Sequence, residues 1–247
     1  MPAAPDGQEL SDRSLTRRAF LARAGMVGVG AVLAQLPGVL RARGMLDVAS
    51  AQDLDLTRDT INGLIAFVVP GPDEYSVAQG ESTAEPGGIA AKGTENLISN
   101  LDRFVPAPDI GQGNDATVPL SGAVANLLNA TAAQVNPVAA GGPFPSHFAR
   151  LAFAEKAEVF RRLEATPGDD ETSGALRFTA GILPGFATFV SFGEWHALDP
   201  ATRQLTERPV GWDLTRYQPG RLVPAEGWEE FRGYYGGRRR AEGTKGR

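Results

Sequence analysis

Apolar residues recur at helical spacing in four stretches of the chain. In the first stretch, the spacing i, i+3, i+4, i+7 places four apolar side chains on one face of a helix. These residues are Ile61, Leu64, Ile65 and Val68. A proline follows each of the four stretches within two residues, as is usual after a helix end. The pattern predicts helices at about 57–69, 88–104, 120–135 and 146–165.

The last of these predicted helices has the clearest division between an apolar and a charged side. Ser146 stands at its start, where a serine hydroxyl can accept hydrogen bonds from free backbone N–H groups. The side chains expected to face the core are Phe148, Leu151, Val159, Phe160 and Leu163. Those expected on the outer side are Glu155, Lys156, Glu158, Arg161 and Arg162.

A fifth segment, 173–194, differs from the others because residues 178–193 carry no charge. A helix that is apolar on every side is normally a buried central element. We therefore expect this segment inside the bundle, kinked or split at Pro184. Its uncharged part is too short and too interrupted by glycine and proline for a stable membrane span, which needs about 20 apolar residues.

These patterns predict a mainly-α fold. Residues 52–237 form, in this interpretation, a single irregular helical bundle domain of about five helices with a long irregular C-terminal segment. That segment begins at Asp199, is rich in proline and glycine, and has room for one short hairpin. Residues 238–247 are basic and predict a disordered tail. No alternation of strands and helices is visible, which argues against a Rossmann-type nucleotide domain.

The first 51 residues have the three parts of an export signal. A polar stretch leads to the pair Arg17 and Arg18, an uncharged and weakly apolar stretch covers 25–40, and Ala49 and Ala51 form a small-x-small cleavage site. Twin arginines before a weakly apolar stretch are typical of the twin-arginine (Tat) pathway. We predict a signal peptide at 1–51, passage through the Tat translocase in the folded state, and a protein in the periplasm, cell envelope or medium.

Composition narrows the function classes further. Twenty-nine acidic residues outnumber 24 basic ones, for a net charge of −5, and this balance argues against nucleic acid as a partner. The chain has no cysteine and only two histidines. Disulfides, thiolate metal sites and covalent haem attachment are therefore excluded. The sequence predicts no cofactor or metal site in this chain.

Recognisable catalytic motifs are missing from the sequence. It contains no phosphate-binding glycine loop, no nucleophile elbow and no zinc-protease motif. One enzymatic alternative is an active site that only the fold assembles, with His147 close to Asp169 or Glu194. The other interpretation of His147 is a capping or surface residue, and the run 169–171 is then a solvated acidic turn.

Three short stretches follow one family pattern. Residues 64–71 read LIAFVVPG, residues 86–89 and 97–101 read PGGI and LISNL, and residues 209–217 read PVGWDLTRY. Together they resemble the small-subunit family typified by gluconate 2-dehydrogenase subunit 3, in which a Tat signal is also typical. The glycine–asparagine stretch usual before the terminal Gly-Trp of that family is replaced here by residues 199–203.

The resemblance implies a non-catalytic accessory and escort subunit. Members of that family accompany a large flavoprotein dehydrogenase subunit of the glucose–methanol–choline oxidoreductase class. The large subunit holds FAD and crosses the membrane folded on the small subunit. Contacts with such a partner are expected at large aromatic residues, which are enriched in buried interfaces. The candidates are Phe186, Phe189, Trp195, Trp212 and Tyr217.

Two other functions stay open at this point. The chain is alternatively a stand-alone secreted enzyme, or an envelope protein with a binding or structural task. The neighbouring gene discriminates between the escort function and these two alternatives, because an escort subunit requires a flavoprotein that has no export signal of its own.

Overall fold

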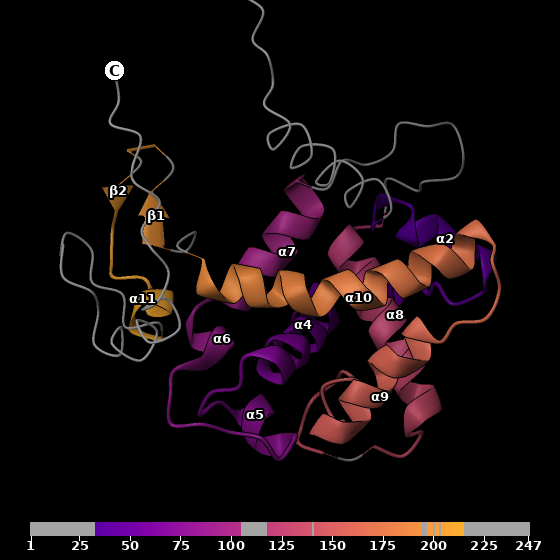
Figure 1. The fold of residues 1–247 in the computed structure, drawn as a ribbon, viewed down its shortest axis with the longest axis horizontal. Coiled ribbons are helices and arrows are strands. Elements are labelled where there is room, and N and C mark those ends of the chain that lie inside the picture. The colour runs from indigo at the N-terminus through magenta and orange to yellow at the C-terminus, as the bar shows by residue number, and fades with distance from the viewer. Residues whose placement is uncertain are drawn as a thin grey trace, which may run out of the picture.

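The structure is a computed structural model that describes residues 33–104, 118–139, 141–193, 197–199, 201–202 and 204–214. The described chain is mainly helical, which confirms the predicted fold class (Figure 1). The long helices are α4 (Leu54–Val68), α7 (Gly93–Phe104), α8 (Leu120–Val135), α9 (Phe153–Glu164) and α10 (Glu171–Phe192). The short helices are α2 (Leu36–Ala42), α3 (Val48–Gln52), α5 (Glu74–Ala78), α6 (Gly87–Ala90) and α11 (Val210–Leu214).

The hydrophobic core lies between α4, α8 and the helices that surround them. Three residues of the predicted apolar stripe of α4, Ile61, Leu64 and Ile65, are fully buried, while Val68 is half-buried at the edge of the core. The stripe meets a second stripe on α8. The central side chains are Ile61, Leu64, Ile65, Val124, Leu127 and Leu128. Helix α10 crosses the front of this core in Figure 1 and packs against α4, α7 and α9.

Helix α9 begins seven residues later than the sequence pattern predicts. Residues 146–151 form turns, and the helix starts at Phe153, where the Glu155 carboxylate accepts a hydrogen bond from the Ala152 N–H. Phe148 and Leu151 lie in these turns and are both fully buried. Apolar residues thus keep a helical spacing here although the backbone is not helical. The Ser146 hydroxyl accepts a hydrogen bond from the Ala149 N–H at 3.1 Å, as predicted for a cap, but it caps this turn rather than the start of α9. The same hydroxyl donates to the Asn129 side chain.

Helix α10 differs from its prediction in two ways. It runs unbroken through Pro184, so it is not split there. It is also not buried on every side, since the inner face is buried while Phe189 and Phe192 are 61% and 40% exposed. Packing of the inner face offsets the one backbone hydrogen bond that the proline removes.

Helix α10 is also long and apolar enough to cross a membrane, the one such helix in the described part of the chain. Forty-four per cent of its apolar window is buried in the core. The core helix of a soluble protein meets the same criteria of length and composition. Its contacts with α4, α7 and α9 account for the apolar residues of its inner face.

The N-terminal boundary of the packed unit lies before the predicted cleavage site. Leu33, Leu36 and Leu40 belong to the hydrophobic core, and Ala51 is only 1% exposed. Helices α2 and α3 both pack against α8. Residues 33–51 are thus part of the folded unit, although the sequence pattern assigns them to a signal peptide. Arg17 and Arg18 lie outside the described residues.

At the other end, β1 (Leu198–Asp199) and β2 (Gln204–Leu205) form a short antiparallel pair in the segment for which the sequence left room for a hairpin. Leu198 pairs with Leu205, and Asp199 pairs with Gln204. Helix α11 then packs against α10, and Gly211 lies so close to the Phe192 carbonyl that a Cβ atom would stand 2.7 Å from its oxygen. Residues 215–237 and the predicted tail 238–247 lie outside the described residues.

Candidate functional site

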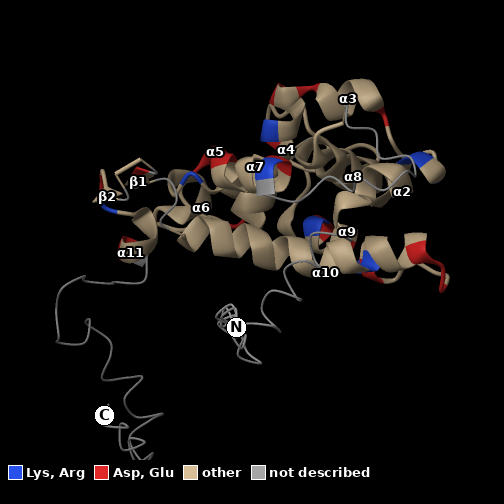
Figure 2. Ribbon diagram, turned by 90° about the horizontal axis from the view of Figure 1, so that it is seen from above, with Lys and Arg blue, Asp and Glu red and all other residues tan. Residues whose placement is uncertain are grey.

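The most distinctive surface of the described chain is the outer face of α10. Exposed and half-buried residues without charge follow one another along it at spacings of three and four residues, which is the spacing of one helix face. These residues, the α10 surface from here on, are Phe178, Gly181, Gly185, Phe189 and Phe192. Figure 2 shows that α10 is free of charged residues over most of its length, with charges gathered near its N-terminal end.

Two glycines leave the middle of the α10 surface open. A Cβ atom added at Gly181 or Gly185 would meet nothing within 4 Å. Phe189 projects one turn beyond Gly185, with 61% of the residue exposed. A helix or loop from another molecule can approach the backbone closely at the glycines and cover the phenylalanines. The surface therefore suits burial of an apolar partner, since exposed apolar patches commonly mark interaction sites.

The contact residues predicted from the sequence differ in how far they are exposed. Phe189 is exposed on the α10 surface, whereas Phe186 is half-buried and packs against the core. Trp212 is half-buried in α11, and the Arg208 guanidinium lies 5.7 Å from its ring centre. Trp195 and Tyr217 lie outside the described residues. Of the three candidates that the structure describes, only Phe189 is strongly exposed. Phe192 is a further exposed aromatic residue that was not among the five candidates.

A buried polar network lies between α4, α8 and the turn at 146–149. The Asp59 carboxylate accepts hydrogen bonds from the Tyr75 hydroxyl at 2.7 Å and the Ser146 backbone N–H at 2.7 Å. The Asn129 amide donates to Thr60 at 2.8 Å and accepts from the Ser146 hydroxyl at 2.8 Å. Burial and the bond to Asp59 raise the pKa of Tyr75 above its usual range. The network ties the turn to two helices.

Lys156 is the second polar feature of the core. The sequence pattern places it on the outer side of its helix, and this prediction is wrong, because Lys156 is fully buried. Its Nζ donates to the Gly63 carbonyl at 3.2 Å and to Gln79 Oε1 at 2.8 Å, and lies 5.6 Å from the centre of the Phe148 ring. Burial lowers the pKa of Lys156 to about 7, while Asp73 and Asp59 act in the opposite direction.

The bonds of this polar core are structural in character. Lys156 donates a hydrogen bond to the Gly63 carbonyl of α4. Gln79, its other acceptor, donates to the Ala66 carbonyl on the same helix. Asp59, Asn129 and Ser146 are held by hydrogen bonds that join α4, α8 and the turn at 146–149. The sequence signal for these residues was weak, because Asp59 and Thr60 are two of several polar residues in the first half of α4 and the apolar spacing does not distinguish them.

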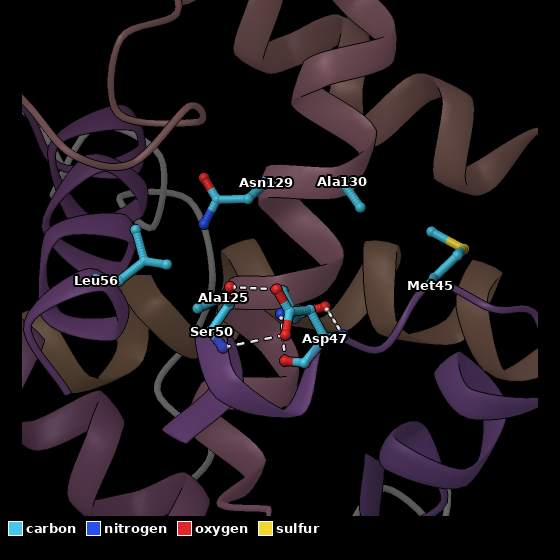
Figure 3. A pocket seen from close by; sticks show the side chains of 8 residues that line it. Met45, Asp47, Ser50, Leu56, Ala125, Asn129 and Ala130 are labelled. Atoms are coloured by element: carbon cyan, nitrogen blue, oxygen red, sulfur yellow. Dashed lines mark hydrogen bonds between the residues drawn. The ribbon is translucent and has the colours of Figure 1, made fainter. Parts of the chain in front are cut away.

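A pocket of about 220 Å³ lies between α3, α4 and α8 (Figure 3). Its polar lining comes mainly from Asp47, Ser50, Asn126 and Asn129. The Asp47 carboxylate already accepts bonds from the backbone N–H groups of Ala49 and Ser50 and from the Ser50 hydroxyl. Asp47, Ser50 and Asn126 therefore bond to one another and hold α3 against α8, whereas Asn129 belongs to the buried polar network.

The structure describes only part of the residue set of the enzymatic alternative. The Nε2 atom of the half-buried His147 lies 2.5 Å from the Asn136 carbonyl oxygen. Asp169 is exposed in the turn before α10, and Glu194 and His196 lie outside the described residues. Within the described ranges, no group of three or more histidine, aspartate or glutamate side chains is arranged to hold a metal ion.

Comparison of the chain with protein-family profiles, with curated proteins and with solved structures finds no match in any of the three.

Proposed function

We propose that this chain is a non-catalytic accessory subunit that binds a flavin-dependent oxidoreductase and escorts it through export. The observation that carries the proposal is the exposure of Phe189 and Phe192 on an uncharged helix face. The resemblance to the gluconate 2-dehydrogenase subunit 3 family supplies the kind of partner. The twin-arginine pattern at Arg17 and Arg18 supplies the route.

The physical basis of partner binding is the apolar area that α10 leaves in contact with water. Full burial of one phenylalanine side chain is worth about 1.5–3 kcal/mol. Residues 178–193 contain no charge, so a partner can cover this face without removing an unpaired charge from water. The flanking glycines Gly181 and Gly185 allow that partner to come close to the helix backbone.

The division of labour follows from the export route. The Tat pathway is needed when a protein folds, or takes up its cofactor, before it crosses the membrane. In the proposed complex FAD belongs to the large subunit, and this chain contributes the export signal and the docking surface. The chain needs no active site of its own for that role.

Replacing Phe189 with alanine tests the docking surface. We expect the affinity for the flavoprotein to fall by about 2 kcal/mol or more, as for a buried interface anchor. The melting temperature of the isolated subunit should stay nearly unchanged, because the side chain is 61% exposed. Titration of the purified partner and thermal unfolding of the free subunit give the two values.

Val77→Ala is the matched control for this experiment, because Val77 is 59% exposed but lies on α5 rather than α10. It should change neither the affinity nor the melting temperature. A large fall in melting temperature for Phe189→Ala, with unchanged affinity of the folded molecules, would show that Phe189 is a core residue and would remove the α10 surface from the proposal.

A further inference from the structure

Residues 33–52 close one end of the helical core. Leu36 and Leu40 of α2 are fully buried, and Leu33 and Ala51 are each 1% exposed. Helix α2 packs against α8 and α10, while α3 packs against α8 and α4. Every residue of α8 from Leu120 to Leu128 is buried, so α8 has no solvent-facing side along this length. Removal of residues 33–51 would expose one side of α8 to water.

Specific polar contacts hold this segment as well. The Asn126 side chain on α8 accepts a hydrogen bond from the Asp47 N–H at 3.0 Å and donates one to the Asp47 carbonyl at 3.1 Å. The Arg43 guanidinium donates to the Ser173 hydroxyl at 2.7 Å and lies 3.7 Å from the Asp170 carboxylate. The first pair ties the segment to α8, and the second ties it to the start of α10.

The closest backbone approach in this region requires a glycine. A Cβ atom at Gly122 of α8 would stand 1.8 Å from the Ala51 carbonyl oxygen, far inside van der Waals contact. Glycine inside a helix is destabilising relative to alanine unless another element needs the space. The backbone of α3 at Ala51 occupies the space that a side chain at position 122 would need. A glycine at this position is therefore expected if α3 is packed against α8.

We infer that residues 33–51 remain in the exported protein as part of its fold, and that any proteolytic maturation cuts before Leu33. This differs from the cleavage after Ala51 that the small-residue pattern predicts. A Tat substrate folds before it is exported, so a peptidase meets the folded chain. In that state Ala51 lies inside helix α3 and is buried, whereas proteolysis favours exposed and locally unfolded chain.

The N-terminus of the exported protein tests the inference directly. The full chain is produced in a Tat-competent host, recovered from the envelope and medium, and analysed by intact mass and N-terminal sequencing. We expect an N-terminus at or before Leu33. A protein that begins at Gln52 would overturn the inference, whether or not it binds a flavoprotein, so the proposed function is tested separately.

Gly122→Ala gives a second test, because it should change the melting temperature in opposite directions when residues 33–51 are retained and when they are removed. If the segment is retained, the added methyl group collides with Ala51, and the melting temperature of the exported protein should fall by roughly 4 °C or more. If the segment has been removed, alanine should raise the melting temperature through its higher helix propensity. Such a rise would contradict retention.

Two further variants complete this second test. Gly174→Ala in α10 is the control, because a Cβ atom there meets nothing within 4 Å, and it should raise the melting temperature in either case. Asn126→Ala should lower the melting temperature if Asp47 is present, and should leave it unchanged if the segment is absent. This variant keeps the test decisive if Gly122→Ala does not fold.

Discussion

The free energy of unfolding is expected to rise as the pH is raised from 7 to 10. The cause is Lys156, which is fully buried and has no carboxylate among its hydrogen-bond partners. Burial lowers the pKa of its ammonium group from 10.5 to about 7. The folded protein therefore keeps this side chain neutral over much of that range, while the unfolded chain keeps it charged.

The sign of the effect follows from proton binding. Between pH 7 and 10 the unfolded state binds more protons than the folded state at this site, so stability increases with pH. The slope approaches about 1.4 kcal/mol per pH unit, which amounts to roughly 3–4 kcal/mol over the range. Above pH 10 the trend should weaken, because the raised pKa of Tyr75 contributes stability that is lost as the pH rises.

Urea unfolding at a series of pH values measures this slope, and Lys156→Met should abolish it while keeping much of the side-chain volume. Lys92→Met is the control, because Lys92 is exposed and paired with Glu207 at the surface, and the slope should survive. If the free energy of unfolding of the unchanged protein is as independent of pH as that of Lys156→Met, then Lys156 stays protonated in the folded state and the account of its burial is wrong.

Asp59→Ala is expected to produce the second large effect, a loss of roughly 3 kcal/mol in the free energy of unfolding. Asp59 is 7% exposed and accepts bonds from the Tyr75 hydroxyl and the Ser146 N–H. Ser146 is fully buried, so its N–H would lose its acceptor away from water. An unsatisfied buried group costs about 1–3 kcal/mol by itself.

Asp55→Ala is the control for this variant, because Asp55 lies one turn earlier on α4 and is exposed. It should cost at most about 1 kcal/mol, the value of a favourable charge near a helix N-terminus. Denaturant unfolding at neutral pH compares the two variants. Equal losses would show that the turn at 146–149 does not depend on the bond to Asp59.

Periodicity located α4 and α8 closely, but it missed the break between α6 and α7 within 88–104 and the turn before α9. The stripe of Ile61, Leu64 and Ile65 was visible because these apolar residues recur at helical spacing. Before α9, Phe148 and Leu151 keep helical spacing, but hydrogen bonds between Ser146, Asn129 and Asp59 hold these residues in turns. Those partners lie far away in the sequence, so no local pattern could have revealed them.

The position of Lys156 and the exposure of α10 were hidden for different reasons. A lysine among charged neighbours predicts a surface position, and only the fold brings the Gly63 carbonyl and Gln79 to it. Along residues 178–193 the absence of charge gives no contrast between faces. The sequence therefore predicted burial on every side, whereas the outward glycines Gly181 and Gly185 mark the open face.

The N-terminal segment shows a further limit of composition. A weakly apolar stretch such as 25–40 fits the apolar region of an export signal, and its second half also fits a core helix. Leu36 and Leu40 satisfy both descriptions. Their packing partners on α8 and α10, which sequence order does not disclose, place them in the folded unit.

The location of the flavoprotein in the producing cells tests the central proposal most directly. In cells with the unchanged chain, we predict that the exported protein is recovered in complex with a second chain that carries flavin absorbance. In cells with the double variant Arg17→Lys and Arg18→Lys, both chains should stay in the cytoplasm. An unrelated Tat substrate in the same cells serves as the control and should be exported in both cases. A flavoprotein that reaches the outside normally in the double variant, or an exported chain that carries no flavoprotein, would contradict the escort function.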